Sequence, residues 1–379
     1  MSQKTNIIYD SHAYCIPNLN GNGGFEDISE FRKHLQLAGG IMGHSLPAWR
    51  KSDRKNNDNY KMVYPQPNWS FDSLKNVELN LKGHGRFEWK EKGEDYIKQI
   101  LPPAISGMEY SAENLIAEMD YAGVNNVLLH RTPYLGIGNE FVSLCVKQFP
   151  DRINALAHIP EWQISTNQDK CISKLHKAIT EMNLSGLQFL PLFMNLYDKS
   201  EDWDSEKYIP FWNFVRDLNI PVFFTLGPRS ENTASNYFDE LKVLARWIEK
   251  YPDIPTVLTH GFNWRMFRNG NNINLPKTIF EILPIQNPNF YVQLVLSVTL
   301  GAKWEYPMNQ FRTCLNTIID KIGINNLLWG SDHPFEMLHY TYRQCIDQIR
   351  NYEDILSEEG VANILGLNMQ TLMNNNPND

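Results

Sequence analysis

The chain has 379 residues, of which 42% are hydrophobic and 21% charged, the balance of a folded globular protein rather than a disordered one. Its 35 Lys and Arg residues against 43 Asp and Glu residues give a formal net charge of −8, which argues against a nucleic-acid partner. The sequence contains no apolar run of about 18 residues, the length that a membrane span needs, and its first residues do not follow the pattern of a secretory signal. We therefore expect a cytoplasmic protein with neither a nucleic-acid nor a membrane partner.

Eight short, nearly continuous apolar runs follow one another along the chain, separated by turns and helical patterns. They cover residues 6–10, 126–130, 153–158, 186–190, 220–225, 255–260, 290–294 and 326–330. Runs of this length and character are typical of strands buried on both faces of a parallel sheet. Eight such strands alternating with helices predict a (β/α)8 barrel, and a doubly wound open sheet is the alternative.

Helical patterns occupy the connections between these runs. One helix is expected to begin after Ser111, whose hydroxyl suits an N-cap, and to end at Gly123. In the next connection the apolar residues recur at helical spacing and predict a second buried face made of Phe141, Leu144, Cys145 and Phe149. Similar patterns at residues 172–182 and 238–248 predict two further helices.

The first connection is much longer than the others. More than 100 residues separate the first two strands, whereas later strands begin about 25–40 residues apart. Residues 16–110 make up this segment, which leaves the carboxyl end of strand one, where barrel enzymes build their sites. We interpret it as a lid and pocket wall within a single domain that spans residues 1–379. A peripheral insertion with no contact to the site is the alternative.

Polar side chains gather where the predicted strands end. In chain order, these residues are His12, Tyr14, His130, His158, Gln188, Thr225, His260 and Asp332. In a barrel the carboxyl ends of all strands meet on one face, so we expect these side chains to surround one site. Imidazole and carboxylate together are the ligands of zinc and similar divalent cations, which lower the pKa of bound water toward neutrality.

Three segments at these strand ends resemble those of a known family. They are Asp10-Ser-His-Ala-Tyr14 after the first strand, Leu258-Thr-His-Gly-Phe262 at the sixth, and Leu328-Trp-Gly-Ser-Asp-His-Pro-Phe-Glu336 at the eighth. Together they resemble the amidohydrolase-related group of metal-dependent barrels, which includes the aminocarboxymuconate-semialdehyde decarboxylase-like enzymes. The resemblance extends from about residue 6 to residue 374, apart from most of residues 20–105.

The resemblance implies a metal site, but the chain departs from the family pattern. Tyr14 stands where a second strand-one histidine is expected, Thr225 where strand five presents a histidine, and Gln188 where binuclear relatives carry a bridging carboxylated lysine. The implied set is therefore one divalent ion, zinc or manganese, on His12, His260 and Asp332, with Tyr14 and His158 as further candidate ligands. A site without metal, in which Asp332 and His260 work as an acid/base pair, is the alternative.

The resemblance further implies an enzyme that hydrolyses a small substrate, expected to be carboxylated. In this reaction Asp332 would take the proton of the attacking water and His260 would polarise the carbonyl. Arg131 and Arg229 are placed to pair with a substrate carboxylate, and His130, Gln188 and Thr225 complete the expected substrate-binding set. Two alternatives stay open, which are a non-oxidative decarboxylase and a catalytically silent subunit that supports an active homologue. A homo-oligomer and a hetero-oligomer with such a homologue are both compatible with the sequence.

Overall fold

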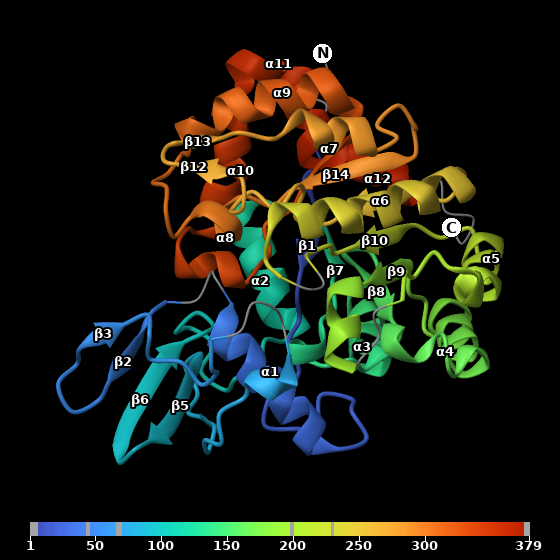
Figure 1. The fold of residues 1–379 in the computed structure, drawn as a ribbon. Coiled ribbons are helices and arrows are strands. Elements are labelled where there is room, and N and C mark those ends of the chain that lie inside the picture. Colours follow the sequence, from blue (N-terminus) through green and yellow to red (C-terminus); the bar gives the residue numbers. More distant parts are fainter. Residues whose placement is uncertain (1–6, 43–45, 66–69, 198–200, 229–230, 375–379) are drawn as a thin grey trace.

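The protein is built around an eight-stranded parallel sheet whose strands follow one another in chain order (Figure 1). The computed structural model describes residues 7–42, 46–65, 70–197, 201–228 and 231–374. The strands of the sheet are β1 (Tyr9–Ala13), β7 (Asn126–Leu129), β8 (Ile153–His158), β9 (Gly186–Phe189), β10 (Val222–Phe224), β11 (Thr256–Leu258), β14 (Phe290–Leu294) and β15 (Leu327–Trp329). Each of them overlaps one predicted strand.

The two outer strands of this sheet, β1 and β15, meet and close it into a barrel. Ala13 and His333 form a parallel bridge, in which the backbone N–H of Tyr14 donates to the His333 carbonyl at 2.7 Å. One residue earlier, the backbone N–H of Asp332 donates to the His12 carbonyl at 2.8 Å. This closure confirms the predicted (β/α)8 barrel and excludes the open, doubly wound sheet.

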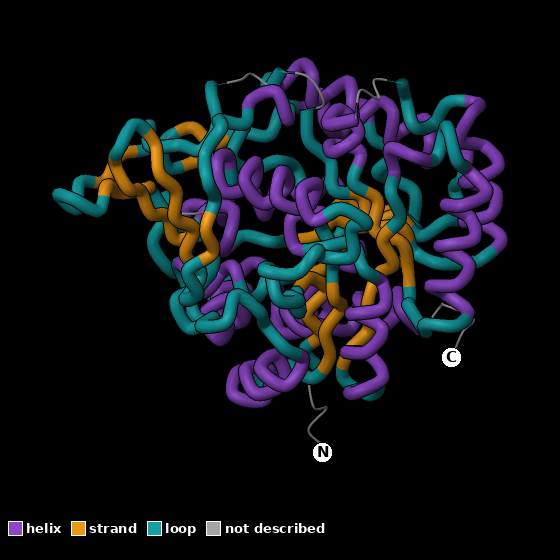
Figure 2. Tube along the Cα trace, turned by 90° about the horizontal axis from the view of Figure 1, so that it is seen from below, coloured by secondary structure: helices purple, strands orange, loops and turns teal. Residues whose placement is uncertain are grey.

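Helices surround the barrel (Figure 2). They are α2 (Ala112–Ala122), α3 (Asn139–Gln148), α4 (Gln168–Thr180), α5 (Ile209–Asp217), α6 (Ala234–Lys250), α7 (Lys277–Ile282), α8 (Ser297–Leu300), α9 (Arg312–Ile322), α10 (Tyr342–Arg350), α11 (Glu353–Ala362) and α12 (Asn368–Asn374). As predicted, Ser111 caps α2 and Gly123 ends it with a φ of 83°. The predicted buried face of α3 is wrong at Leu144, which is 64% exposed, because the helix turns its shorter side chains to the barrel. In the described ranges, no helix is long and apolar enough to cross a membrane.

An apolar layer fills the barrel toward the amino ends of its strands. One buried cluster joins inward side chains from six strands with three side chains of α12, namely Tyr9, Leu128, Leu156, Phe223, Val257, Leu328, Met369, Leu372 and Met373. Because side chains alternate between the two faces of a strand, the residue two positions beyond each of these points inward as well. His130, His158 and Thr225 occupy such positions, above the apolar layer and at the carboxyl ends of their strands.

Residues 16–110 form a separate layer beside the barrel. Ile16 and Tyr110 pair with each other as an antiparallel bridge, so the segment leaves and re-enters the barrel at one point. It contains α1 (Ile28–Ile41) and an antiparallel sheet in the order β3-β2-β6-β5-β4, with β2 (Ala48–Arg50), β3 (Asn56–Asn57), β4 (Asn80–Leu81), β5 (Arg86–Glu91) and β6 (Glu94–Gln99). Figure 1 shows α1 near the end of the barrel toward which β1 runs, with the sheet standing off to one side. A further short pair, β12 (Arg268–Asn269) and β13 (Asn272–Ile273), lies in the connection after β11.

The carboxylate of Asp10 holds β1 against the chain that follows β15. Its Oδ1 accepts the backbone N–H groups of His12 and Ser331, both at 3.0 Å, and its Oδ2 accepts the hydroxyls of Ser331 at 2.5 Å and Tyr342 at 2.7 Å. The residue is fully buried. Burial raises the pKa of Asp10 despite these four hydrogen bonds, which act in the opposite direction.

We predict that Asp10→Ala lowers the free energy of unfolding by about 3 kcal/mol or more, because it leaves several buried donors without an acceptor. Urea denaturation monitored by tryptophan fluorescence measures the loss. As a matched control, Asp120→Ala removes an exposed carboxylate that pairs with Arg152 at 2.8 Å, and its cost should stay below about 1 kcal/mol. Equal losses in the two variants would contradict the role given to Asp10.

Candidate functional site

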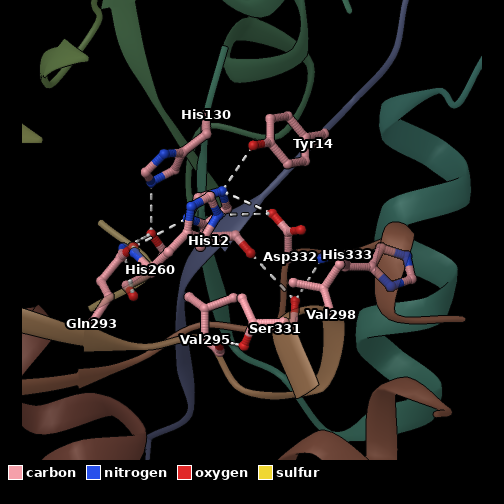
Figure 3. A network of polar contacts seen from close by, with 12 residues as sticks. His12, Tyr14, His130, His260, Gln293, Val295, Val298, Ser331, Asp332 and His333 are labelled. Carbon is pink, nitrogen blue, oxygen red and sulfur yellow. Dashed lines mark hydrogen bonds and ion pairs between the residues drawn. The ribbon is translucent and has the colours of Figure 1, made fainter. Parts of the chain in front are cut away.

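Two histidines and one aspartate from three strands converge at the carboxyl end of the barrel (Figure 3). His12 Nε2 lies 3.0 Å from Asp332 Oδ1, and His260 Nε2 lies 3.4 Å from the same oxygen. The ligand atoms of all three residues lie within 4.8 Å of one another. The His12 side chain is fully buried, whereas that of His260 is 31% exposed, so the group opens to solvent beside His260. We call His12, His260 and Asp332 the ligand group.

Two residues of the ligand group have an unusual backbone. His260 has a φ of 61° and Asp332 a φ of 67°, a left-handed conformation that is uncommon outside glycine and tends to mark functional sites. Next to them, Gly330 permits the close approach of two strands, since a Cβ there would lie 2.8 Å from His12 Cβ. The chain is thus bent locally where β11 and β15 end, at the two turns that deliver His260 and Asp332.

Gln293 on β14 orients His12. Its amide nitrogen donates to the carbonyl and the hydroxyl of Ser11 at 2.8 and 3.0 Å, so its oxygen faces His12 Nδ1 at 3.1 Å. A neutral His12 therefore carries its proton on Nδ1 and presents the lone pair of Nε2 to Asp332. Gln293 was not among the site residues predicted from the sequence, although a single glutamine inside the apolar strand Phe290–Leu294 is a usable signal.

This arrangement fits one cation. With His12 oriented in this way, its Nε2 and the Asp332 carboxylate are both acceptors, and contact at 3.0 Å requires a proton or a cation between them. Burial acts to raise the pKa of Asp332, but the contacts with His12 and His260 outweigh it and hold the pKa well below its usual value. Burial lowers the pKa of His260, which favours the neutral imidazole that binds metals. Two imidazoles and one carboxylate match a catalytic zinc-like site in number and type.

Tyr14 and His130 lie against the ligand group (Figure 3). The Tyr14 hydroxyl is 2.9 Å from His12 Nε2, and burial together with Asp332 raises the pKa of this phenol well above its usual value. Tyr14 therefore stays protonated in this arrangement and is a hydrogen-bond donor to the group. The His130 ring stacks on His12 with a centroid distance of 3.6 Å, and its Nε2 lies 2.9 Å from the Ser11 carbonyl.

The other strand-end residues lie on the neighbouring strands. His158 is fully buried with Nδ1 at 3.9 Å from Oε1 of the equally buried Glu161, and it is not part of the ligand group. The Gln188 side-chain oxygen accepts the backbone N–H of Arg131. The Thr225 hydroxyl is buried and has no partner in the described part of the chain.

The structure does not support Arg131 as a clamp for a substrate carboxylate. Its guanidinium is fully buried and donates to the carbonyls of Cys15 at 3.4 Å, Leu135 at 3.3 Å and Gly136 at 2.6 Å. These bonds tie the end of β1 to the turn after β7, and burial lowers the pKa of Arg131 to about 10. Arg229, the second expected clamp, lies outside the described residues.

Arg265 is better exposed than Arg131. It follows β11, and its Nε and Nη2 donate to the carbonyls of Thr299 at 2.7 Å and Val298 at 2.8 Å. Burial lowers the pKa of Arg265, whereas the charge of Asp332 acts in the opposite direction, so the guanidinium lies within electrostatic range of the ligand group. The side chain is nevertheless solvent-exposed, as a ligand-binding arginine must be.

Glu336 contacts His333 rather than the ligand group. His333 Nδ1 lies 2.6 Å from Glu336 Oε1, and its Nε2 lies 2.6 Å from the Tyr110 hydroxyl. All three residues are buried. This chain of contacts joins the turn after β15 to the end of the 16–110 segment.

Replacing Gln293 should weaken metal binding. Gln293→Met keeps the length of the side chain but removes the acceptor for His12 Nδ1–H, and we predict zinc affinity lower by about 10- to 100-fold. Gln293→Glu keeps an acceptor and should lose less. Competition with a chelating indicator measures both constants, and a folded Gln293→Met protein that binds zinc as tightly as the unchanged chain would contradict the orientation of His12 described above.

Glu161 should make stability depend on pH. Burial raises its pKa to about 8 from an ordinary value of 4.5, so the folded chain binds this proton more tightly than the unfolded chain. The stability due to this proton is fully present below pH 4.5 and is lost as pH rises through about 8. We predict that Glu161→Gln reduces this decline by at least about 1 kcal/mol in urea denaturation at a series of pH values. Glu358→Gln, on the surface of α11, is the control, and parallel profiles for Glu161→Gln and the unchanged chain would refute the assignment.

Comparison with known proteins agrees with this fold. A curated 2-amino-3-carboxymuconate-6-semialdehyde decarboxylase from Dictyostelium discoideum is 19% identical over 256 residues, which are 63% of this chain and 66% of the relative. Among solved structures, a probable 2-pyrone-4,6-dicarboxylic acid hydrolase from Acinetobacter baumannii with citric acid bound has a TM-score of 0.51 at 17% identity, over 70% of this chain and 90% of that one. An amidohydrolase from Burkholderia multivorans gives a TM-score of 0.53 at 13% identity, over 71% of this chain and 90% of that one.

The family assignment itself rests on a sequence model of the amidohydrolase family, which matches residues 84–370. The match includes His260 and Asp332 and begins after β1, so His12 lies outside it. Two of the three strand-end segments that resemble this family, residues 258–262 and 328–336, lie within this match over most of the chain, and the first segment lies outside it. The protein belongs to the amidohydrolase family and is an enzyme of the hydrolase or decarboxylase type.

Proposed function

We propose that this chain is a metal-dependent hydrolase that acts on a small carboxylated substrate. The observation that carries the proposal is the convergence of His12, His260 and Asp332 within 4.8 Å at the carboxyl end of the barrel. These three residues would hold one divalent ion, zinc or manganese, which would supply a Lewis acid when bound. Tyr14 would donate a hydrogen bond beside it.

The residues in and around the ligand group have different roles in this proposal. Asp332 has a low pKa and is ionised at neutral pH, so it is the group that accepts a proton from the attacking water. His260 is the solvent-facing member of the ligand group and is placed to contact the carbonyl oxygen of an entering substrate. Gln293 and Asp10 hold His12 and its strand in place and touch no substrate.

We assign the substrate carboxylate to Arg265 rather than to Arg131. Two backbone carbonyls fix the Arg265 guanidinium at Nε and Nη2, which leaves the two N–H groups of Nη1 and the second N–H of Nη2 as donors that can face a ligand. Its location after β11 places it on the same loop as His260, the open member of the ligand group. Arg229 stays a candidate for the same task. We also propose that residues 16–110 act as a lid, since α1 lies near the strand ends and His34 on it is 2.9 Å from the Tyr197 hydroxyl after β9.

A non-oxidative decarboxylase is the second candidate, favoured by the curated relative from Dictyostelium discoideum. In that reaction the substrate carboxylate is the group that leaves as CO2, and a protonated side chain must deliver a proton to the carbon left behind. Asp332 has too low a pKa to hold that proton by itself, and His260, the solvent-facing member of the ligand group, would relay the proton from solvent. The site geometry is compatible with both reactions.

Metal analysis tests the proposal. We predict at most one zinc or manganese ion per chain, lost in both Asp332→Asn and His260→Ala because each removes one of three ligands. His176→Ala, an exposed histidine on α4, is the matched control and should retain the metal. Metal-loaded protein should then hydrolyse members of a panel of carboxylated lactones and amides, and CO2 release from carboxylated arenes should be measured in parallel to detect the decarboxylase.

A chain that does not bind metal would contradict the proposal. A purified chain that holds no metal, and whose stability and activity do not respond to added Zn2+ or Mn2+, would rule out the metal-dependent mechanism. Acid/base catalysis by Asp332 and His260 would then account for any turnover, and a complete lack of turnover would leave the silent-subunit alternative.

A further inference from the structure

Polar groups inside the barrel fall into two sets. Those on β1, β14 and β15 are bonded to one another, as described for His12, Gln293 and Asp332. At the carboxyl ends of β7, β8, β10 and β11, five buried atoms have no hydrogen-bond partner among the described residues. They are His130 Nδ1, His158 Nδ1, His158 Nε2, Thr225 Oγ1 and Thr259 Oγ1.

The four side chains that carry these five atoms point to the same side of the sheet. His130, His158, Thr225 and Thr259 each stand two positions beyond a residue of the apolar barrel layer, namely Leu128, Leu156, Phe223 and Val257. Residues two apart on a strand point to the same side, so all four side chains point into the barrel at its carboxyl end. The register agrees, because His158 pairs with Gln188, and Gln188 pairs with the inward-facing Phe223.

Such a concentration of unpartnered groups is unusual. Buried polar atoms in proteins almost always have partners, and leaving them without one costs free energy. His130 and His158 are both fully buried, so bulk solvent does not supply the partner. His158 Nδ1 lies 3.9 Å from Glu161 Oε1, too far for a hydrogen bond, so the barrel interior contains polar groups that are free to bond a bound polar group.

We propose that His130, His158, Thr225 and Thr259 form a second substrate subsite, which holds a neutral hydrogen-bond-donating group, a hydroxyl or an N–H, beside the ligand group. The inference rests on the proposed function only in calling the bound molecule a substrate. It adds a substrate class, because the molecule would carry a donor group in addition to the carboxylate assigned to Arg265.

The chemistry of the four side chains favours a bound group that donates a hydrogen bond over a bound carboxylate. His130 Nε2 faces the Ser11 carbonyl, which only accepts, so a neutral ring leaves Nδ1 as an acceptor. None of the four side chains carries a fixed positive charge, and the nearby Arg131 guanidinium is turned to backbone carbonyls. A buried carboxylate here would face the His130 lone pair, whereas a hydroxyl can donate to it and accept from Thr225 or His158.

Matched ligands test the subsite without any turnover. The probes are 3- and 4-hydroxybenzoate, each compared with the methylbenzoate of the same shape, because His130 already contacts the rings of Tyr14 and Phe223. Isothermal titration of the full chain, with and without zinc, measures the affinities. We expect at least one hydroxyl probe to bind about fivefold to tenfold more tightly than its methyl counterpart, the effect of about one net hydrogen bond.

Two substitutions test which side chains cause the preference for a hydroxyl over a methyl group. Thr225→Val and His158→Leu remove unpartnered polar atoms and should abolish the preference while leaving the melting temperature unchanged or higher, because neither breaks a side-chain hydrogen bond in the described part of the chain. Thr313→Val, on the exposed surface of α9, is the control and should keep the preference.

Equal binding of every hydroxyl and methyl pair by the unchanged chain would overturn the proposal and would indicate that the atoms hold only buried water. A preference that survives in both Thr225→Val and His158→Leu would overturn it as well. Because the readout is binding, loss of the proposed hydrolase activity or of the metal leaves this result interpretable on its own.

Discussion

The carboxylate of Asp10 is bonded on one side to its own strand and on the other to the chain that leaves β15, and this pair of contacts closes the barrel. Closure makes the first and last strands neighbours, which brings His12 and Asp332 to 3.0 Å although they are far apart in sequence. Gly330 lets the two strands approach because it has no Cβ to meet His12. The ligand group is therefore a product of barrel closure, and whatever loosens the junction between β1 and β15 must also loosen the site.

The barrel interior shows how a stable fold carries a site that is locally unfavourable. The layer toward the amino ends of the strands is apolar and is covered by α12, and its burial stabilises the fold. The layer at the carboxyl ends of the strands contains left-handed backbone at His260 and Asp332 and polar atoms without hydrogen-bond partners at His130 and His158. Each of these features costs free energy in the protein without a ligand. Backbone strain and polar atoms without hydrogen-bond partners thus occur together at the carboxyl ends of the strands, as expected where a site is shaped to bind a ligand.

The sequence predicts the barrel and the ligand group well, because both depend on patterns that are local in the chain. Eight apolar runs mark the strands, and His260 and Asp332 lie at or just beyond the ends of two of them. What the sequence does not predict depends on side-chain direction across the fold. Arg131 follows His130 and was expected to face a ligand, yet its side chain turns to carbonyls near Cys15 and Gly136, and no local pattern distinguishes these directions. Gln293 was missed for the opposite reason, since its role depends on a contact with a residue at the other end of the chain.

Anomalous diffraction from crystals grown with zinc and measured at the zinc absorption edge tests the central claim most directly. The account predicts one strong peak per chain, about 2.0–2.2 Å from His12 Nε2, His260 Nε2 and one Asp332 oxygen. A map with no peak at these three residues, at zinc concentrations that saturate the protein in solution, would contradict the claim that this group is a metal site.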